Sequence, residues 1–235
     1  MKKLMAIITM LTLLFTMTAC SGSDSSESEK DDGLTITYEN NTLTVEGKGE
    51  LTADAICEQL DIKVSDIATG RTTTLIIGDG VTAIEKDLFR NCKILNSVTL
   101  GKDVEEIGEY AFYGCSITEI TIPDSVKSIG KSAFGACESL EKVTLGIGIE
   151  KIADYTFTQC FSLKEVTVPE NVTAIGEGAF FRCSSLEKVT LSDGLETIGE
   201  EAFVLCGSLS EIEIPQSVKT VAEDAFGKDT KVIRK

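Results

Sequence analysis

The chain has 235 residues and a formal net charge of -16, because 38 acidic residues outnumber 22 basic ones. The basic residues form no cluster, which disfavours a surface for nucleic acid or another polyanion. The chain contains no histidine, which excludes an imidazole base, a Ser-His or Cys-His pair and a histidine metal ligand. At 42% hydrophobic residues the chain can bury a core. Composition therefore predicts a folded protein, disfavours catalysis and implies no cofactor.

The N-terminus has the pattern of a targeting segment. Two lysines precede an apolar stretch from Leu4 to Thr18, which is short for a membrane span and typical of a signal peptide. The stretch ends in Met17-Thr18-Ala19-Cys20, which resembles the lipobox of bacterial lipoproteins. That resemblance implies a lipoprotein signal peptide over residues 1–19 and lipidation of Cys20. The alternative is ordinary secretion without a lipid anchor.

A strongly polar segment follows the lipobox cysteine. Residues 21–32 contain five serines and five acidic residues. Such a composition cannot bury apolar surface. We therefore predict a disordered, lipid-anchored tether over residues 20–33.

Residues 34–73 are expected to form an N-terminal cap for the segment that follows. Leu34 to Gly49 contains two strand-like stretches around Asn40-Asn41, the pattern of a β-hairpin. Thr52 is suited to cap a short helix from Ala53 to Leu60. A cap of this kind would cover the strand edges and apolar columns that an open array leaves in water.

From Thr74 onward the sequence repeats every 22 or 23 residues. A phenylalanine recurs in each repeat, and in six repeats a cysteine follows it three positions later. These residues are Phe89, Phe112, Phe134, Phe157, Phe180, Phe203 and Phe226, with Cys92, Cys115, Cys137, Cys160, Cys183 and Cys206. Such a period predicts a solenoid over residues 74–235, in which like side chains stack on one another.

Each repeat is predicted to supply one strand. In Glu141 to Leu145 apolar and polar residues alternate, which is the pattern of a strand with one buried face. The rest of the repeat should return through tight turns and a short helical segment around the Ala-Phe pair. The predicted fold class is an α/β solenoid with one parallel sheet of about seven strands. At the C-terminus the spacing aligns Val232 with the column that contains Leu140.

The repeat resembles a known family. The motif Leu140-x-x-Val143-x-Leu145 and the run from Ile122 to Cys137 look like the treponemal-type leucine-rich repeats of BspA-like surface proteins, and the likeness covers residues 74–228. The segment Leu34 to Gly49 is similar to the hairpin that often precedes such arrays. The resemblance implies a right-handed leucine-rich-repeat array and a role in adhesion and host or cell contact. A shared scaffold does not by itself fix function.

The column of six cysteines has two explanations. Neighbouring repeats about 5 Å apart would bring thiols within disulfide range, and thiolates bind metals. A recurring position beside the phenylalanines is more simply a small buried apolar side chain. With Cys20 set aside, seven thiols remain, including Cys57 in the cap, so full pairing within one chain is excluded. We expect packing, without bridges or metal.

Two columns of polar residues are predicted to lie on the exposed face of the sheet. They are Lys142, Glu165 and Lys188, which alternate in charge, and Thr144, Thr167 and Thr190. Such columns stabilise register and keep a sheet soluble, which is one explanation for them. The other explanation is that this face binds a polar partner, and these six residues are then candidate binding residues.

Three aromatic residues fall outside the buried phenylalanine column, namely Tyr113, Phe161 and Phe181. Exposed aromatic side chains at one edge would suit a contact with a partner. Local packing against neighbouring turns is the alternative explanation.

Acidic residues form a further column three positions before the phenylalanines, at Asp154, Glu177, Glu200 and Glu223. Stacked carboxylates can bind Ca²⁺, and with Glu201 they offer carboxylates to a hydrolase. The chain has no calcium-loop pattern and no cleft that the sequence reveals. A solvated acidic ridge is the preferred explanation.

Together these features predict a protein of the bacterial cell envelope, lipid-anchored to the membrane on its extracellular face. Its repeats are expected to bind an extracellular protein or glycan, without catalysis and without nucleic acid. The alternatives are a passive envelope scaffold and a carboxylate-based hydrolase. A solute-binding lipoprotein is disfavoured because the chain lacks alternating strand and helix segments.

Overall fold

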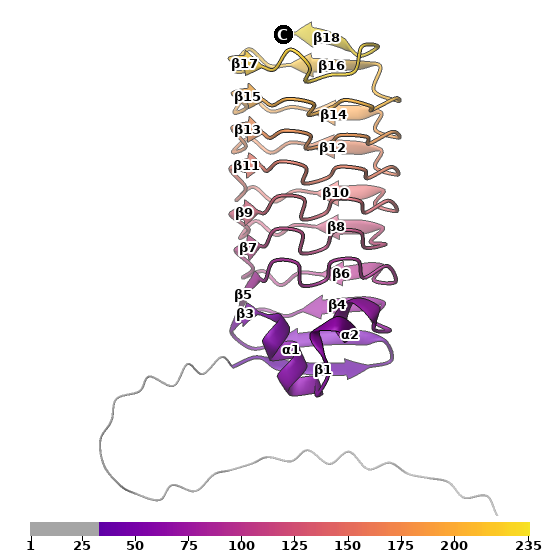
Figure 1. Cartoon of the computed structure of the whole chain (residues 1–235). Helices are drawn as coiled ribbons and strands as arrows, with labels where there is room; N and C mark the ends of the chain where they lie inside the picture. The colour runs from indigo at the N-terminus through magenta and orange to yellow at the C-terminus, as the bar shows by residue number, and fades with distance from the viewer. Residues whose placement is uncertain (1–32) are drawn as a thin grey trace, which may run out of the picture. The chain divides into compact units, whose positions relative to one another are not determined.

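The structure is a computed structural model and describes residues 33–235. The predicted signal peptide, Cys20 and all but the last residue of the predicted tether lie outside the described residues. In the described part, successive repeats stack on one another along a single axis (Figure 1). Neither helix in this part approaches the length and apolarity that crossing a bilayer requires.

The N-terminal cap begins with the predicted hairpin. Strand β1 (Thr35–Glu39) pairs antiparallel with β2 (Thr42–Glu46). Between them Asn40 and Asn41 have positive φ angles of 50° and 63°. A two-residue hairpin turn of type I′ requires this left-handed backbone twice in succession, and asparagine tolerates it. The hairpin prediction is therefore confirmed.

Helix α1 (Ala53–Leu60) begins where the sequence predicts. Oγ1 of Thr52 accepts a hydrogen bond from the N–H of Ala55 at 3.1 Å, which satisfies a donor of the first turn. A second helix, α2 (Val64–Thr69), is not predicted, because six residues are too few to display a helical period. Each helix buries one isoleucine, Ile56 and Ile67, in the common core.

From Thr74 onward each repeat supplies a longer strand to one row of parallel strands (Figure 1). This row contains β4 (Thr74–Ile77), β6 (Ser97–Thr99), β8 (Glu119–Thr121), β10 (Lys142–Thr144), β12 (Glu165–Thr167), β14 (Lys188–Thr190), β16 (Glu211–Ile214) and β18 (Lys231–Arg234). Strands β4 to β16 account for the predicted seven, and β18 is added at the C-terminus. The predicted solenoid with a parallel sheet is therefore confirmed.

A second row of short parallel strands corrects the prediction of a single sheet. It contains β3 (Gly49–Leu51), β5 (Val81–Ile84), β7 (Glu106–Ile107), β9 (Ser128–Ile129), β11 (Lys151–Ile152), β13 (Ala174–Ile175), β15 (Thr197–Ile198) and β17 (Thr220–Val221). Ile152 pairs with Ile175, and Ile175 pairs with Ile198. Most of these strands have two residues, which is too few for a period of two to appear in the sequence.

The Ala-Phe segment forms turns, and the prediction of a short helix there is wrong. The N–H of Phe134 donates to the carbonyl of Thr156 in the next repeat at 3.0 Å, whereas the N–H of Gly135 turns back to the carbonyl of Ser132 at 3.0 Å. Ser132 and Ala136 have positive φ angles of 53° and 52°. Left-handed residues before and after Phe134 prevent an α-helix from forming. Alternate N–H groups of this segment therefore donate to carbonyls of the next repeat and not to carbonyls one helical turn earlier.

The core consists of columns of like side chains. The seven phenylalanine rings stack with centroid separations of 5.2–5.7 Å and interplanar angles of 5–13°. The first six rings are buried, and columns of leucine, isoleucine and valine pack around them. No single repeat could enclose this core, so each repeat depends on its neighbours for stability.

The C-terminal repeat corrects one predicted alignment. Val232 pairs with Ile212 at the centre of β16 and does not continue the column of Leu140. Phe226 still stacks on Phe203. Phe203 and Ile212 are nine positions apart, while Phe226 and Val232 are six apart, so this repeat lacks three residues of the turn. That shorter turn brings Val232 into the strand, where it is 44% exposed.

Candidate functional site

The predicted columns of polar residues lie side by side on β10, β12 and β14. Lys142 pairs in register with Glu165, and Glu165 pairs with Lys188. Thr167 pairs with Thr190 in the same manner. These side chains are exposed, while the residues between them, such as Val166, point into the core. The alternation of the strand therefore presents the charged column and the threonine column on one surface.

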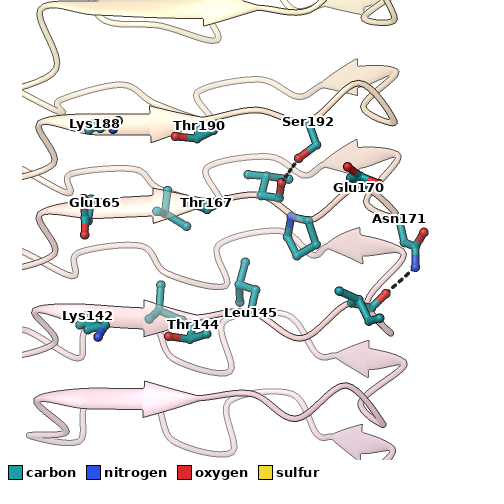
Figure 2. Close-up of a pocket in the computed structure, with 15 residues that line it drawn as sticks. Lys142, Thr144, Leu145, Glu165, Thr167, Glu170, Asn171, Lys188, Thr190 and Ser192 are labelled. Atoms are coloured by element: carbon teal, nitrogen blue, oxygen red, sulfur yellow. Dashed lines mark hydrogen bonds between the residues drawn. The ribbon is translucent and has the colours of Figure 1, made fainter.

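These columns line an open groove of about 700 Å³ that crosses the three strands (Figure 2). The charged column forms one margin, and the threonine column lies beside it. The other margin is formed by Leu145, Ile147, Pro169, Glu170, Asn171 and Ser192. The volume is within the range typical of ligand sites. The structure brings all six candidate residues of the strand face to this groove, and their binding role stays a prediction.

An ion pair lies one residue before the charged column. Nζ of Lys164 is 2.7 Å from Oε2 of Glu141 on the preceding repeat. This hydrogen bond lowers the pKa of the Glu141 carboxyl and raises the pKa of the Lys164 ammonium. Both side chains are more than half exposed, so water screens the pair and its contribution to stability is small. Its main effect is to favour the register between neighbouring repeats.

Ile147 is the one large aliphatic residue exposed in the groove, and it was not predicted as a binding residue. Its side chain is 60% exposed, although it is aliphatic. At the corresponding position of the turn the other repeats carry Asp79, Lys102, Asp124, Glu170, Asp193 and Gln216. One aliphatic residue in a column of polar ones is a signal that alignment of the repeats would have found.

The backbone of Ile147 is held on both sides. Its N–H donates to Oδ1 of Asp124 in the preceding repeat at 3.0 Å. Its carbonyl accepts a hydrogen bond from Nδ2 of Asn171 in the following repeat at 2.7 Å (Figure 2). The hydroxyl of Ser192 likewise donates to the carbonyl of Val168. These bonds link successive turns and fix this margin of the groove.

A second hollow, of about 730 Å³, lies on the same row of strands nearer the N-terminus. It is lined by Thr99, Glu119 and Thr121, which belong to the same polar columns. In the turn beside it Lys102 takes the position that Ile147 has in the groove. The two hollows therefore share their polar columns, and only the groove on β10, β12 and β14 has an isoleucine at this turn position.

The three candidate aromatic residues lie apart from the groove. Phe161 and Phe181 are half-buried and do not line it. Tyr113 is also half-buried and borders a separate hollow of about 380 Å³. The guanidinium carbon of Arg90 lies 5.6 Å from the centroid of the Tyr113 ring, which is a cation–π contact. The structure does not bring these aromatics together with the strand-face residues, and their role stays a prediction.

The cysteine column is built into the core. All seven cysteines within residues 33–235 are free, and the six in the column are buried. Five of the column thiols donate to the carbonyl of the phenylalanine in the preceding repeat, as Cys160 does to Phe134 at 3.3 Å and Cys183 to Phe157 at 3.2 Å. The first, Cys92, donates to the carbonyl of Ile67 in the cap. Burial raises the pKa of the Cys137 and Cys206 thiols to about 12. These two thiols therefore stay protonated at neutral pH, and the column packs as small side chains.

These raised pKa values predict a loss of stability in alkali. Between the ordinary thiol pKa of 9.0 and the folded value of about 12 for Cys137, the unfolded chain releases a proton that the folded chain keeps. Stability should therefore be fully present below about pH 9 and fall as the pH rises toward about 12. Urea unfolding of the reduced protein at about pH 8, 10 and 11 measures this fall. Cys137→Ala should make it shallower by up to about 1.4 kcal/mol per pH unit, and an unchanged slope would contradict the prediction.

The acidic column forms local hydrogen bonds. Oδ1 of Asp154 accepts from the N–H of Glu177 at 3.0 Å, and the Glu177 carboxylate accepts from the hydroxyl of Tyr155. That hydrogen bond raises the pKa of Tyr155 to about 12. Within residues 33–235 no group of three or more Cys, Asp or Glu side chains is placed to hold a metal ion. The explanation of this column as a solvated acidic ridge stays a prediction.

Comparison with known proteins identifies the repeat. A family model for the BspA type leucine rich repeat region matches in six copies, over residues 68–175 and 105–233. A search of curated proteins found no match.

Solved structures of bacterial proteins share the fold. A leucine-rich repeat protein from Bacteroides ovatus is 22% identical with a TM-score of 0.58, and the alignment covers 86% of this chain and 66% of that protein. This chain thus spans slightly less than two thirds of that protein. The leucine-rich repeat protein of T. pallidum is 23% identical with a TM-score of 0.57, over 74% of this chain and 86% of that one. By its repeats and its fold, the chain belongs to the BspA type leucine-rich repeat family.

Proposed function

We propose that this protein is a lipid-anchored protein of the bacterial cell surface whose solenoid binds an extracellular protein or glycan, in adhesion or in contact with a host or another cell. The groove across β10, β12 and β14 carries this proposal. Leucine-rich repeat proteins typically bind other proteins through the extended surface of their repeats and are not enzymes. A passive envelope scaffold is the alternative.

The groove supports binding because its polar groups are exposed and in order. The hydroxyls of Thr144, Thr167 and Thr190 can each donate and accept a hydrogen bond. Thr144 and Thr167 belong to β10 and β12, which pair with a strand on each side, and Thr190 belongs to β14, which pairs with β12. Binding would therefore cost little conformational entropy in these strands. The alternating charges of Lys142, Glu165 and Lys188 would favour a partner with the complementary pattern.

The lipobox resemblance of Met17-Thr18-Ala19-Cys20 supports the membrane anchor. An acidic chain without a basic cluster gains no electrostatic attraction to an anionic membrane, so a lipid would have to hold it there. Mass spectrometry of the native mature protein should find an acylated N-terminal Cys20. Cys20→Ser should release the protein from the membrane fraction, and retention of that variant would contradict lipid anchoring.

Glu165→Lys is expected to weaken binding at least about tenfold, because it replaces the alternating column by three adjacent positive charges. The measurement is capture of residues 33–235 on an array of purified matrix proteins and glycans. Glu106→Lys on β7 is the matched control, since this exposed glutamate lies in the other row of strands. Equal capture by parent and Glu165→Lys would reject the groove, and a parent that captures nothing would favour the passive scaffold.

A further inference from the structure

We propose that the groove recognises a polypeptide, through an aliphatic side chain of the partner that packs against Ile147 and Pro169. This inference rests on the proposed function of the groove and specifies its partner as a protein segment. It follows from the exposed side chain of Ile147, from its rigid backbone and from the polar groups around it.

The exposure of Ile147 is the first observation. Single exposed apolar residues are common on protein surfaces and need no explanation by themselves. Ile147 differs because six other repeats carry a charged or amide side chain at its position and because it lies on the same margin of the groove as the half-buried Pro169. A partner side chain seated there would remove apolar surface from water on both molecules, at about 25 cal/mol per Å².

The second observation is that this apolar margin is preorganised. The Ile147 N–H and carbonyl are both engaged, by Asp124 at 3.0 Å and by Asn171 at 2.7 Å. These two partners come from the preceding and the following repeat, so the turn that carries Ile147 is fixed between its neighbours. A fixed anchor loses little conformational entropy when a partner binds, which is what an energetically dominant contact requires.

The third observation is the combination of groups in the groove. The exposed Ile147 on one margin, a column of hydroxyls and a column of alternating charges lie next to one another. This is the arrangement of an interface in which polar groups surround an apolar anchor. A polypeptide can supply an aliphatic side chain, backbone hydrogen-bonding groups and charged side chains at once, whereas a neutral sugar chain supplies hydroxyls. The residues that line the groove include no aromatic ring on which a sugar could stack.

A random-peptide phage library, panned on residues 33–235, tests the inference alongside a glycan array. Enriched peptides should share an isoleucine, leucine or valine, and a synthetic peptide of the enriched sequence serves as the probe. Ile147→Asp should weaken its binding at least about tenfold, while Ile147→Leu should retain it. Ile94→Asp is the matched control, because Ile94 is 45% exposed and lies outside the groove.

The outcomes separate the two proposals. Peptides whose binding survives Ile147→Asp, or a library that yields no enriched peptide, would overturn the aliphatic anchor. A glycan lost with Glu165→Lys and retained with Ile147→Asp would overturn the inference and leave the groove as the binding site. Ligands that both groove variants bind as well as the parent would reject the groove as the binding site and overturn the inference with it.

Discussion

Replacing Phe157 with alanine is expected to lower the free energy of unfolding by about 3–5 kcal/mol. The ring is fully buried and stacks between Phe134 at 5.7 Å and Phe180 at 5.5 Å. Alanine would remove both ring contacts and leave a cavity. The cavity cannot close easily, because the N–H of Phe157 is bonded to the carbonyl of Ala179 in the next repeat at 2.8 Å. Urea unfolding followed by circular dichroism measures the loss.

Phe226→Ala is the matched control for this substitution. Phe226 is half-buried, stacks on Phe203 at 5.5 Å, and follows it at the C-terminal end of the column. Its removal should lower the free energy of unfolding by less than half as much as Phe157→Ala, because less surface is buried and fewer contacts are lost. Equal losses at the two positions would contradict the stacked column as the main source of stability.

Gly194→Ala is expected to lower the free energy of unfolding by about 2–3 kcal/mol. A Cβ atom built on Gly194 would lie 1.8 Å from the carbonyl oxygen of Glu170 and 3.0 Å from its carbonyl carbon. These are backbone atoms, which cannot rotate away as a side chain can. Two neighbouring repeats would have to move apart, and the strands that they share would lose part of their pairing. Urea unfolding of the variant measures the loss.

Gly207→Ala provides the control, because the nearest atom to a Cβ there is the carbonyl oxygen of Ser184 at 4.0 Å. This substitution should be neutral or raise the free energy of unfolding by up to about 1 kcal/mol, since alanine restricts the unfolded chain. If Gly194→Ala were equally neutral, the close approach between the turns would be wrong.

The same close approach explains where glycines follow prolines along the array. A Cβ on Gly146 would lie 2.3 Å from the carbonyl oxygen of Pro123, and one on Gly148 would lie 2.2 Å from that of Asp124. The turns that contain Pro123 and Pro169 direct carbonyl oxygens toward the next repeat. Gly194 makes the same close approach to the carbonyl of Glu170, whereas Ser192 takes the position of Gly146 in the repeat that follows Pro169.

The sequence by itself determined the solenoid fold and the columns of residues that form its core. Repeats that stack in space place like residues at like positions, so the columns of Phe157 and Cys160 are visible as a period in one dimension. The strand at Lys142–Thr144 is long enough to alternate, and the Asn40-Asn41 turn and the Thr52 cap depend on adjacent residues alone. Contacts that are local or strictly periodic can be predicted in this way.

Only the tertiary structure decided which groups meet between repeats. The second row of strands, such as Lys151–Ile152, is too short to have a period of its own and exists because neighbouring repeats pair there. The turns around Phe134 depend on which carbonyl each N–H reaches. The groove arises where side chains of three successive repeats, such as Ile147, Thr167 and Lys188, line one surface, and the direction and exposure of Ile147 depend on Asp124 and Asn171. These features depend on distances between atoms more than twenty residues apart, and the order of residues along the chain does not specify those distances.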